Sequence, residues 1–253
     1  MSEWFGTWFD SDYYHLLYKD RDFTEAENFV EKLATHLKPN TDDLILDLAC
    51  GKGRHSVHLN KLGFDVEGSD YSANSIKYAK QFENKRLQFY VQDMRLPFPR
   101  KYDFILNLFT SFGYFDTETE HMNTLKNIYK GLNENGIFVF DFMNVDHVLA
   151  HLVAYETVTK GHIDFEIRRD LINGKITKDI IFLDKRIPYH YTEKVSLRYT
   201  KIMEMMTETG FTVQDSFGDY ALSPFDSEKS KRWEVDKCME PSGPRASLQQ
   251  MRR

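Results

Sequence analysis

The fold of this chain is decided by the stretch Leu44-Ile45-Leu46-Asp47-Leu48-Ala49-Cys50-Gly51-Lys52-Gly53-Arg54-His55. Its first part is a short apolar run that ends in an acid, which is typical of a strand buried on both faces. Gly51 and Gly53 follow in a tight turn, where glycine adopts backbone angles that other residues avoid and lets a ligand approach the main chain. A helix then begins, and its N-terminus directs unpaired N–H groups at whatever lies over the turn. This combination predicts a nucleotide or nucleoside site.

The composition of the whole chain limits the fold classes and the partners that can be expected. Of its 253 residues 41% are hydrophobic, which is enough for one large α/β domain with a small accessory piece. The formal net charge of −6 gives no reason to expect strong non-specific nucleic-acid binding. Cys50 and Cys238 form no metal-binding pattern, so no metal is expected. Because no apolar run is long enough for a membrane helix and the N-terminus does not resemble a basic leader, we expect a soluble cytoplasmic protein with no membrane partner.

Strands and helices alternate through the first half of the chain. Helices are predicted from two capping boxes, Thr24 with Glu27 and Thr117 with Glu120, and from a capping residue at Ser72. The predicted strands are residues 43–48, 64–70, 87–91, 102–106 and 137–142. This alternation predicts a doubly wound, Rossmann-like α/β sheet that is mostly parallel and covered by helices on both faces.

A different pattern follows the fifth strand. Residues 155–199 alternate in the strand period, and Asn173-Gly174 between two such runs is typical of a hairpin turn. We therefore expect an antiparallel β insertion, either a hairpin or three strands. A helix at 200–209 and a strand from Phe211 then return to the core.

Three acids stand at the ends of the first three predicted strands. They are Asp47, Asp70 and Asp93, and each follows the one before it by 23 residues. In an open α/β sheet, ligands bind outside the carboxyl ends of the strands, where the strand order reverses. Asp70 is well placed for ribose hydroxyls because a carboxylate accepts from both at once. Asp93 suits the amino group of a base, and Asp47 is expected to hold the turn or face a positive group.

Together these motifs resemble class I S-adenosylmethionine-dependent methyltransferases. The resemblance rests on residues 47–54, on Asp70 and on Gln92-Asp93-Met94, and it covers roughly residues 24–142 and 200–217. It implies S-adenosylmethionine as cofactor and methyl transfer as the reaction. The residues that it implies for cofactor binding are Asp47, Ala49, Gly51, Gly53, Asp70, Tyr71, Asp93, Met94 and Leu108. The family usually has glycine at the position of Ala49, and this small change leaves the predicted fold intact.

With this resemblance the chain divides into four parts. Residues 1–23 are rich in aromatic side chains, and we expect a strap on the surface or a lid over the ligand. Residues 24–144 and 200–222 form the predicted methyltransferase core, and 145–199 the insertion on the acceptor side. Residues 223–253 match the family's usual antiparallel seventh strand poorly. We therefore expect a partly disordered tail, with an altered reading frame or an appended segment as a hypothesis.

No catalytic base stands out. The candidates near the expected site are Asp141, His147 and His190, and Tyr14 or Phe112 could stabilise the sulfonium cation. The acceptor is expected to be a small molecule. Methylation of RNA or protein stays open, because residues 156–201 hold ten Lys or Arg against seven Asp or Glu. The net negative charge of the whole chain argues against nucleic acid as a partner. A nicotinamide-dependent oxidoreductase and a binding-only relic of the fold are further alternatives. The sequence gives no prediction of oligomeric state.

Overall fold

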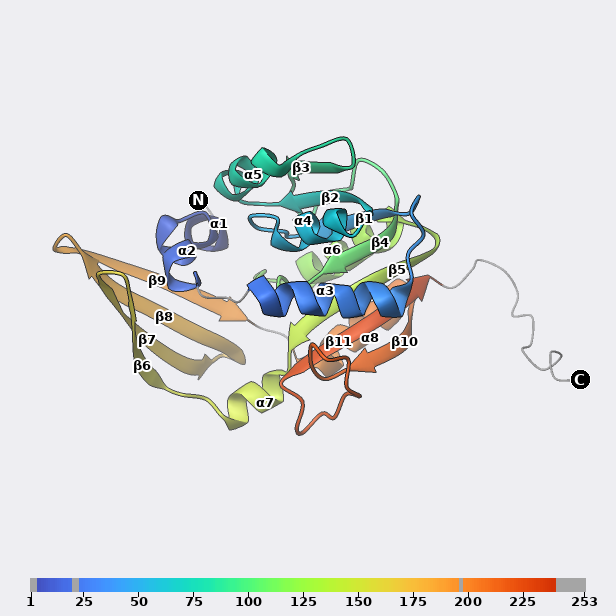
Figure 1. Ribbon diagram of the computed structural model, residues 1–253. Coiled ribbons are helices and arrows are strands. Elements are labelled where there is room, and N and C mark those ends of the chain that lie inside the picture. Colours follow the sequence, from blue (N-terminus) through green and yellow to red (C-terminus); the bar gives the residue numbers. More distant parts are fainter. Residues whose placement is uncertain (1–3, 20–22, 196–197, 240–253) are drawn as a thin grey trace, which may run out of the picture.

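The computed structural model describes residues 4–19, 23–195 and 198–239, without the side chains of 23–25 and 236–239. Its main sheet has seven strands in the order β10-β11-β5-β4-β1-β2-β3 (Figure 1). Their bounds are β1 Leu44–Leu48, β2 Asp65–Asp70, β3 Leu87–Val91, β4 Tyr102–Asn107, β5 Leu132–Met143, β10 Phe211–Phe217 and β11 Arg232–Met239. The five strands β1 to β5 are parallel, as predicted. Strand order reverses between β1 and β4, which is where ligands bind in such sheets.

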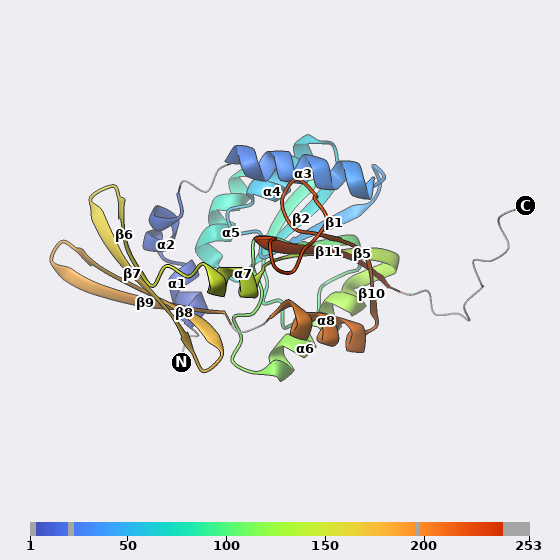
Figure 2. The same cartoon turned by 90° about the horizontal axis from the view of Figure 1, so that it is seen from below.

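Helices cover both faces of this sheet. Figure 2 shows α3 on one face and α6 and α8 on the other. The helices are α3 Phe23–Leu37, α4 Arg54–Lys61, α5 Ala73–Ala79, α6 Glu118–Gly131, α7 Val145–Ala150 and α8 Tyr199–Thr209, with a short 3-10 turn at Lys80–Phe82. Ile45 of β1 packs into one apolar cluster and Leu46 into the other, so the strand is buried on both faces, as its apolar run predicted. No helix among the described residues is long and apolar enough to cross a membrane.

Local signals in the sequence explain several helix ends. Thr117 and Glu120 form the predicted capping box at the start of α6. The Ser72 side chain accepts from the Ser75 N–H at the start of α5. The side chain of Thr24 lies outside the described part of the chain, so the capping box predicted there stays a prediction.

The C-terminal segment differs from the prediction. β11 pairs antiparallel with β5 on one side and with β10 on the other, and Trp233 and Val235 are buried. The expected disorder is therefore wrong for residues 232–239, and the hypothesis of an altered frame or appended segment falls with it. The charges that obscured the strand have specific roles, because Arg232 pairs with a buried acid of β5. The prediction of disorder for 240–253 lies outside the described residues.

The insertion is a second, antiparallel sheet of four strands in the order β6-β7-β8-β9, where a hairpin or three strands were expected. Its strands are β6 Tyr155–Lys160, β7 Ile163–Ile172, β8 Lys175–Asp184 and β9 Ile187–Val195. Asn173 and Gly174 have φ of 52° and 76°, so both adopt the left-handed angles of the predicted hairpin turn. This confirms the predicted antiparallel insertion after β5.

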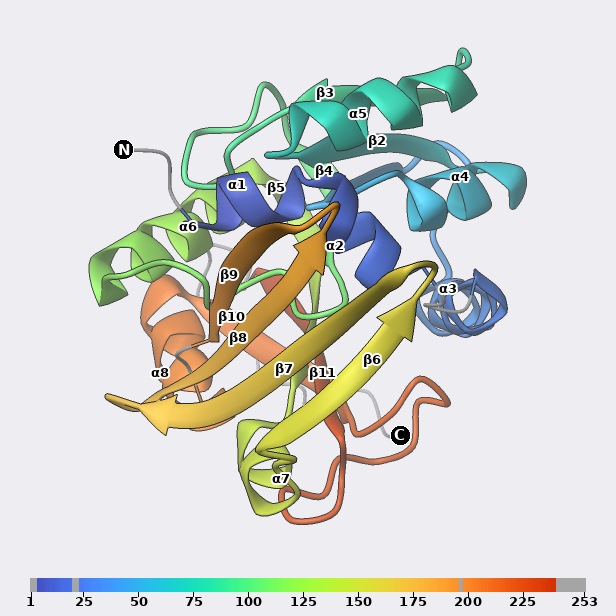
Figure 3. The ribbon, with the colours of Figure 1, turned by 90° about the vertical axis from the view of Figure 1, so that its left-hand side faces the viewer.

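The N-terminal residues form two short helices, α1 Trp4–Phe9 and α2 Asp12–Leu17, here called the strap. Figure 3 shows the strap between the insertion sheet and the main domain. Trp8 and Leu17 pack with Phe165 and Phe182 of the insertion. On the other side, the Asp10 carboxylate accepts hydrogen bonds from the Ser72 hydroxyl and the Asn74 side chain at the start of α5. The strap thus connects the two sheets.

Candidate active site

One large cavity of about 1020 Å³ lies at the carboxyl ends of β1 to β4, below the strap. It is lined by the turn after β1, by residues that follow β2, β3 and β4, and by the strap and β9. The sequence-predicted residues in its wall are Asp47, Ala49, Gly51, Asp70, Tyr71, Asp93, Met94, Leu108, Phe112 and Tyr14. The structure therefore brings together all the residues predicted for cofactor binding except Gly53.

The turn after β1 bends sharply through three left-handed residues. Ala49, Gly51 and Gly53 have φ of 64°, 56° and 81°. A Cβ at Gly51 would meet no atom within 4 Å, so the main chain there borders open space in the cavity wall. A Cβ at Gly53 would stand 2.7 Å from the Phe89 ring. Gly53 therefore serves the packing of α4 against the sheet, whereas Gly51 leaves room for a ligand.

Asp47, at the end of β1, stabilises this turn through hydrogen bonds. Its carboxylate is buried and accepts from the Ser56 N–H at 3.1 Å and the Ser56 hydroxyl at 2.6 Å. These bonds tie the end of β1 to the first turn of α4. The structure thus supports the first of the two roles considered for Asp47, holding the turn.

The pH dependence of stability tests this burial. Burial raises the pKa of Asp47 from 3.8 to about 6, against the opposing effect of the Ser56 hydrogen bonds. Since the folded state binds this proton more tightly than the unfolded state, Asp47 makes the protein less stable as pH rises from about 4 to about 6. Asp47→Asn should lessen that fall, as measured by urea denaturation at each pH. An unchanged pH profile in the variant would remove Asp47 as the titrating group.

Asp70 stands at the end of β2 on the cavity wall. Its two oxygens accept from the Gly51 N–H at 2.8 Å and from the Ser72 N–H at 2.7 Å. Each carboxylate oxygen can accept a second hydrogen bond, so both keep capacity for a ligand's hydroxyl groups. Burial raises the pKa of Asp70, while the two backbone bonds oppose this shift. Tyr71 follows it and packs edge-on against Phe5 of the strap, with ring centres 5.5 Å apart.

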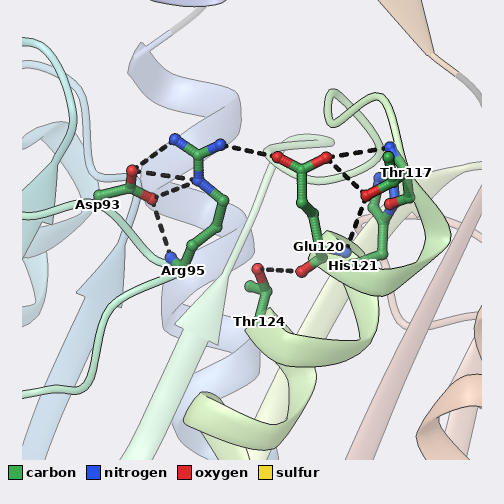
Figure 4. A network of polar contacts seen from close by, with 6 residues as sticks. All are labelled: Asp93, Arg95, Thr117, Glu120, His121 and Thr124. Carbon is green, nitrogen blue, oxygen red and sulfur yellow. Dashed lines mark hydrogen bonds and ion pairs between the residues drawn. The ribbon is translucent and has the colours of Figure 1, made fainter.

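Asp93 has a protein partner that the sequence did not reveal. Arg95 donates from Nε and Nη2 to its carboxylate, with the shortest distance 2.6 Å, and also from its backbone N–H. Arg95 bridges onward to Glu120 of α6 at 3.0 Å, as Figure 4 shows. Partial burial raises the pKa of Asp93, but the bonds from Arg95 outweigh it and the net shift is downward. Direct contact between Asp93 and adenine stays a prediction.

Asp141 was a candidate base, and the structure gives it a structural role. Its buried carboxylate pairs with Arg232 of β11 at 2.6 Å and accepts from the Phe109 N–H at 2.6 Å. Arg232 also donates to the Thr110 hydroxyl at 3.0 Å. Phe109 and Thr110 have positive φ of 58° and 61°, a conformation that persists only where the surroundings hold it. The Asp141–Arg232 pair therefore fixes the turn after β4, which lines the cavity.

Two further candidates lie away from the cavity. His147 stacks on His151 in α7, with ring centres 4.2 Å apart, and His190 bonds to Asp179 within the insertion sheet at 2.9 Å. Neither belongs to the cavity wall. Of the catalytic candidates, only Tyr14 lies in that wall. Within the described residues, no group of three or more His, Cys, Asp or Glu is arranged to hold a metal ion.

Sequence reasoning missed several residues of the wall. Glu193 of β9 accepts from the Trp8 indole and the Tyr18 hydroxyl, both at 2.7 Å, and pairs with Lys178 at 3.5 Å. His15 and His55 also line the cavity. Only the dense aromatic N-terminus hinted at such contacts, because pairing between distant segments leaves no local pattern.

Comparison with known proteins agrees with this geometry. A family model described as "Methyltransferase domain" matches residues 39–210. Glycine/sarcosine N-methyltransferase of Parasynechococcus marenigrum is 29% identical over 235 residues, covering 85% of this chain and 80% of that protein. The enzyme of the same name from Halorhodospira halochloris is 28% identical over 225 residues, covering 81% and 77%.

Solved structures show the same fold. An S-adenosylmethionine-dependent methyltransferase from Clostridium acetobutylicum matches with a TM-score of 0.73 at 18% identity, covering 90% of this chain and 96% of that chain. The CcbJ methyltransferase from Streptomyces caelestis matches with a TM-score of 0.70 at 16% identity, covering 87% and 90%. Because the family match spans more than half of the chain and coincides with the sheet that forms the cavity, the protein belongs to the methyltransferase domain family and is an S-adenosylmethionine-dependent methyltransferase.

Proposed function

We propose that this enzyme transfers the methyl group of S-adenosylmethionine to the nitrogen of a small amine bound in the same cavity. The observation that carries the proposal is the shared wall. Tyr14 and Tyr18 of the strap and Glu193 of the insertion line the same cavity as the turn after β1. Ligand pockets typically measure roughly 300–1,000 Å³, so this volume accommodates a cofactor together with a small acceptor. The glycine/sarcosine N-methyltransferases among the relatives methylate acceptors of that kind by their names.

The residues of the wall fit the cofactor. Space over Gly51 admits its methionine part, and the remaining lone pairs of Asp70 suit the ribose hydroxyls. We assign Tyr71 and Met94 to the two sides of the adenine, with Leu108 completing the pocket. When bound, the cofactor supplies a methyl group already activated on a sulfonium.

The protein then has to orient the cofactor and the acceptor and to exclude water from them. Holding two reactants in line can contribute roughly 7–11 kcal/mol to catalysis. Aromatic rings of the wall such as Tyr14 and Phe112 can stabilise a cation. We assign no general base, because the carboxylates of Asp47 and Asp141 are buried in contacts with the protein. The amine acceptor is expected to bind as the free base.

The other acceptor classes have less support. The basic residues of the insertion that suggested RNA are partly neutralised, for example Arg169 by Glu156 at 2.5 Å and Lys178 by Glu193 at 3.5 Å. The nicotinamide-dependent alternative is excluded by the family match.

Asp70→Ala tests the cofactor site. Loss of hydrogen bonds to a charged group costs about 1.5–3 kcal/mol, hence roughly tenfold to hundredfold in affinity for S-adenosylhomocysteine. Asp65→Ala is the matched control, because Asp65 begins the same strand at the end far from the cavity and pairs with Arg86. Isothermal titration calorimetry measures both variants. Equal affinity in Asp70→Ala and wild type would place the cofactor elsewhere.

The acceptor class is tested by transfer of labelled methyl from S-adenosylmethionine. Separate pools of small amines, RNA and protein are incubated with the enzyme, with glycine and sarcosine included as single compounds. We expect label in the small-amine pool. Label confined to RNA or protein would overturn the proposed acceptor while leaving the cofactor site intact.

A further inference from the structure

One acid of the cavity wall comes from the insertion rather than from the main domain. The acids that line the cavity are Glu27, Asp47, Asp70, Asp93 and Glu193. The first four lie on α3 and at the ends of β1, β2 and β3, and each contacts a group of the main domain. Glu193 lies on β9, which runs beside α1 of the strap (Figure 3). It therefore places a carboxylate on the side of the cavity that the strap and the insertion form.

Three donors hold the Glu193 carboxylate in place. Its Oε1 accepts from the Trp8 indole and the Tyr18 hydroxyl, both at 2.7 Å, and its Oε2 pairs with Lys178 at 3.5 Å. The Glu193 side chain is only 17% exposed, and neither Trp8 nor Lys178 belongs to the cavity wall. These two residues thus fix the carboxylate from outside the cavity. Because a carboxylate has about four acceptor sites, Oε2 keeps capacity for a further donor.

Aromatic rings of the strap lie beside this carboxylate. Tyr14 and Tyr18 both line the cavity, with ring centres 4.9 Å apart, and Phe9 packs against Tyr14 at 5.0 Å. Aromatic faces attract cations, and a carboxylate forms its stronger hydrogen bonds with charged donors. This part of the wall therefore suits a nitrogen that carries a positive charge and apolar methyl groups.

Methyl transfer to an amine produces such a nitrogen. The lone pair of the amine forms the new C–N bond, the electrons of the C–S bond stay on sulfur, and the positive charge moves from sulfur to nitrogen. The product keeps its N–H protons and leaves as a methylated ammonium, so Glu193 takes no proton in this step. A fixed carboxylate beside the nitrogen stabilises the charge as it develops. A thiolate loses its charge on methylation and would gain no such stabilisation.

We propose that Glu193 contacts the acceptor nitrogen, stabilises the positive charge that forms on it, and thereby selects amines as acceptors. This rests on the proposed function, because it requires an amine bound beside the cofactor. Trp8 and Lys178 orient the carboxylate, and the rings of Tyr14 and Tyr18 face the methylated product.

Substitutions in the full chain separate this charge from the hydrogen bonds that hold the strap. Glu193→Gln removes the charge, while the amide oxygen still accepts from Trp8 and Tyr18. Because Lys178 then lacks its acid, the double variant Lys178→Met/Glu193→Gln is measured as well. Glu156→Gln is the control, because Glu156 is also an acid of the insertion sheet paired with an arginine, but lies outside the cavity wall. Transfer of labelled methyl to the small-amine pool gives the rate, and calorimetry gives the affinity for S-adenosylhomocysteine.

We expect Glu193→Gln and the double variant to lower the rate by roughly tenfold to hundredfold, the effect of losing a bond to a charged group. The affinity for S-adenosylhomocysteine and the rate of Glu156→Gln should stay as in wild type. A wild-type rate in Glu193→Gln would overturn the proposal. So would recovery of the rate in the double variant, which would assign the loss to the unpaired lysine, or an equal loss of S-adenosylhomocysteine affinity, which would assign Glu193 to holding the strap. If wild-type protein labels no small amine, the proposed function itself fails, and this inference with it.

Discussion

Arg232→Met is expected to lower the free energy of unfolding by about 3–5 kcal/mol, because it leaves the Asp141 carboxylate buried without its cation. Asp141 is fully buried, and Arg232 also donates to Thr110 in the turn after β4. The apolar stem of methionine keeps the volume of the side chain, so the loss reports on charge and hydrogen bonds. Urea denaturation measures it.

The control for this variant is an ion pair of the same type at the surface. Arg198 pairs with Asp146 at 2.7 Å, and its side chain is 59% exposed. Exposed pairs contribute about 0–1 kcal/mol, so Arg198→Met should leave stability nearly unchanged. A similar small effect of both substitutions would show that the Asp141–Arg232 pair does not hold the turn.

Gly51→Val is expected to abolish binding of S-adenosylhomocysteine while the protein stays folded. The branched side chain would occupy the space over the turn, where no protein atom lies within 4 Å. The left-handed backbone at this position costs a non-glycine residue roughly 1–2 kcal/mol, which a protein of this size tolerates. Calorimetry measures the binding, and circular dichroism confirms the fold.

Gly63→Val is the control that distinguishes the effect of backbone strain from the effect of filling the space over the turn. Gly63 also has a positive φ, 99°, and an added Cβ there would also meet no atom within 4 Å, but it follows α4 outside the cavity wall. Both variants should lose similar stability, and only Gly51→Val should lose binding. Retained binding in Gly51→Val would mean that the cofactor does not lie over this turn.

The predictable part of the fold is the part with local signals. The apolar run ending in Asp47 predicted β1, and Asn173-Gly174 predicted the turn between β7 and β8. β11 was missed because its signal is not local. Glu234 is buried in it, and the Arg232 side chain is only 20% exposed. A largely buried charge such as that of Arg232 is compatible with a strand only when its partner, here Asp141, is already known to lie on the next strand.

The residues of the candidate site likewise divide into those that local sequence patterns predicted and those that they did not. Residues at the ends of strands, such as Asp70 and Met94, were predictable because parallel strands bring their carboxyl ends to one edge. The bond between Glu193 and Trp8 joins residues 185 positions apart and depends on how the insertion sheet folds back over the strap. The partnership of Asp93 with Arg95 was close in sequence, yet an acid and a base two residues apart are too common to indicate a specific pair.

The position of β11 has a consequence for biosynthesis. It is the last described strand to leave the ribosome, but it fits between β5 and β10 rather than at the border of the sheet. Until residues 232–239 emerge, β5 presents an unpaired edge flanked by apolar side chains such as Phe140 and Phe142. Nascent chains in that state are prone to aggregate, so we expect the growing polypeptide to depend on chaperones until β11 is released.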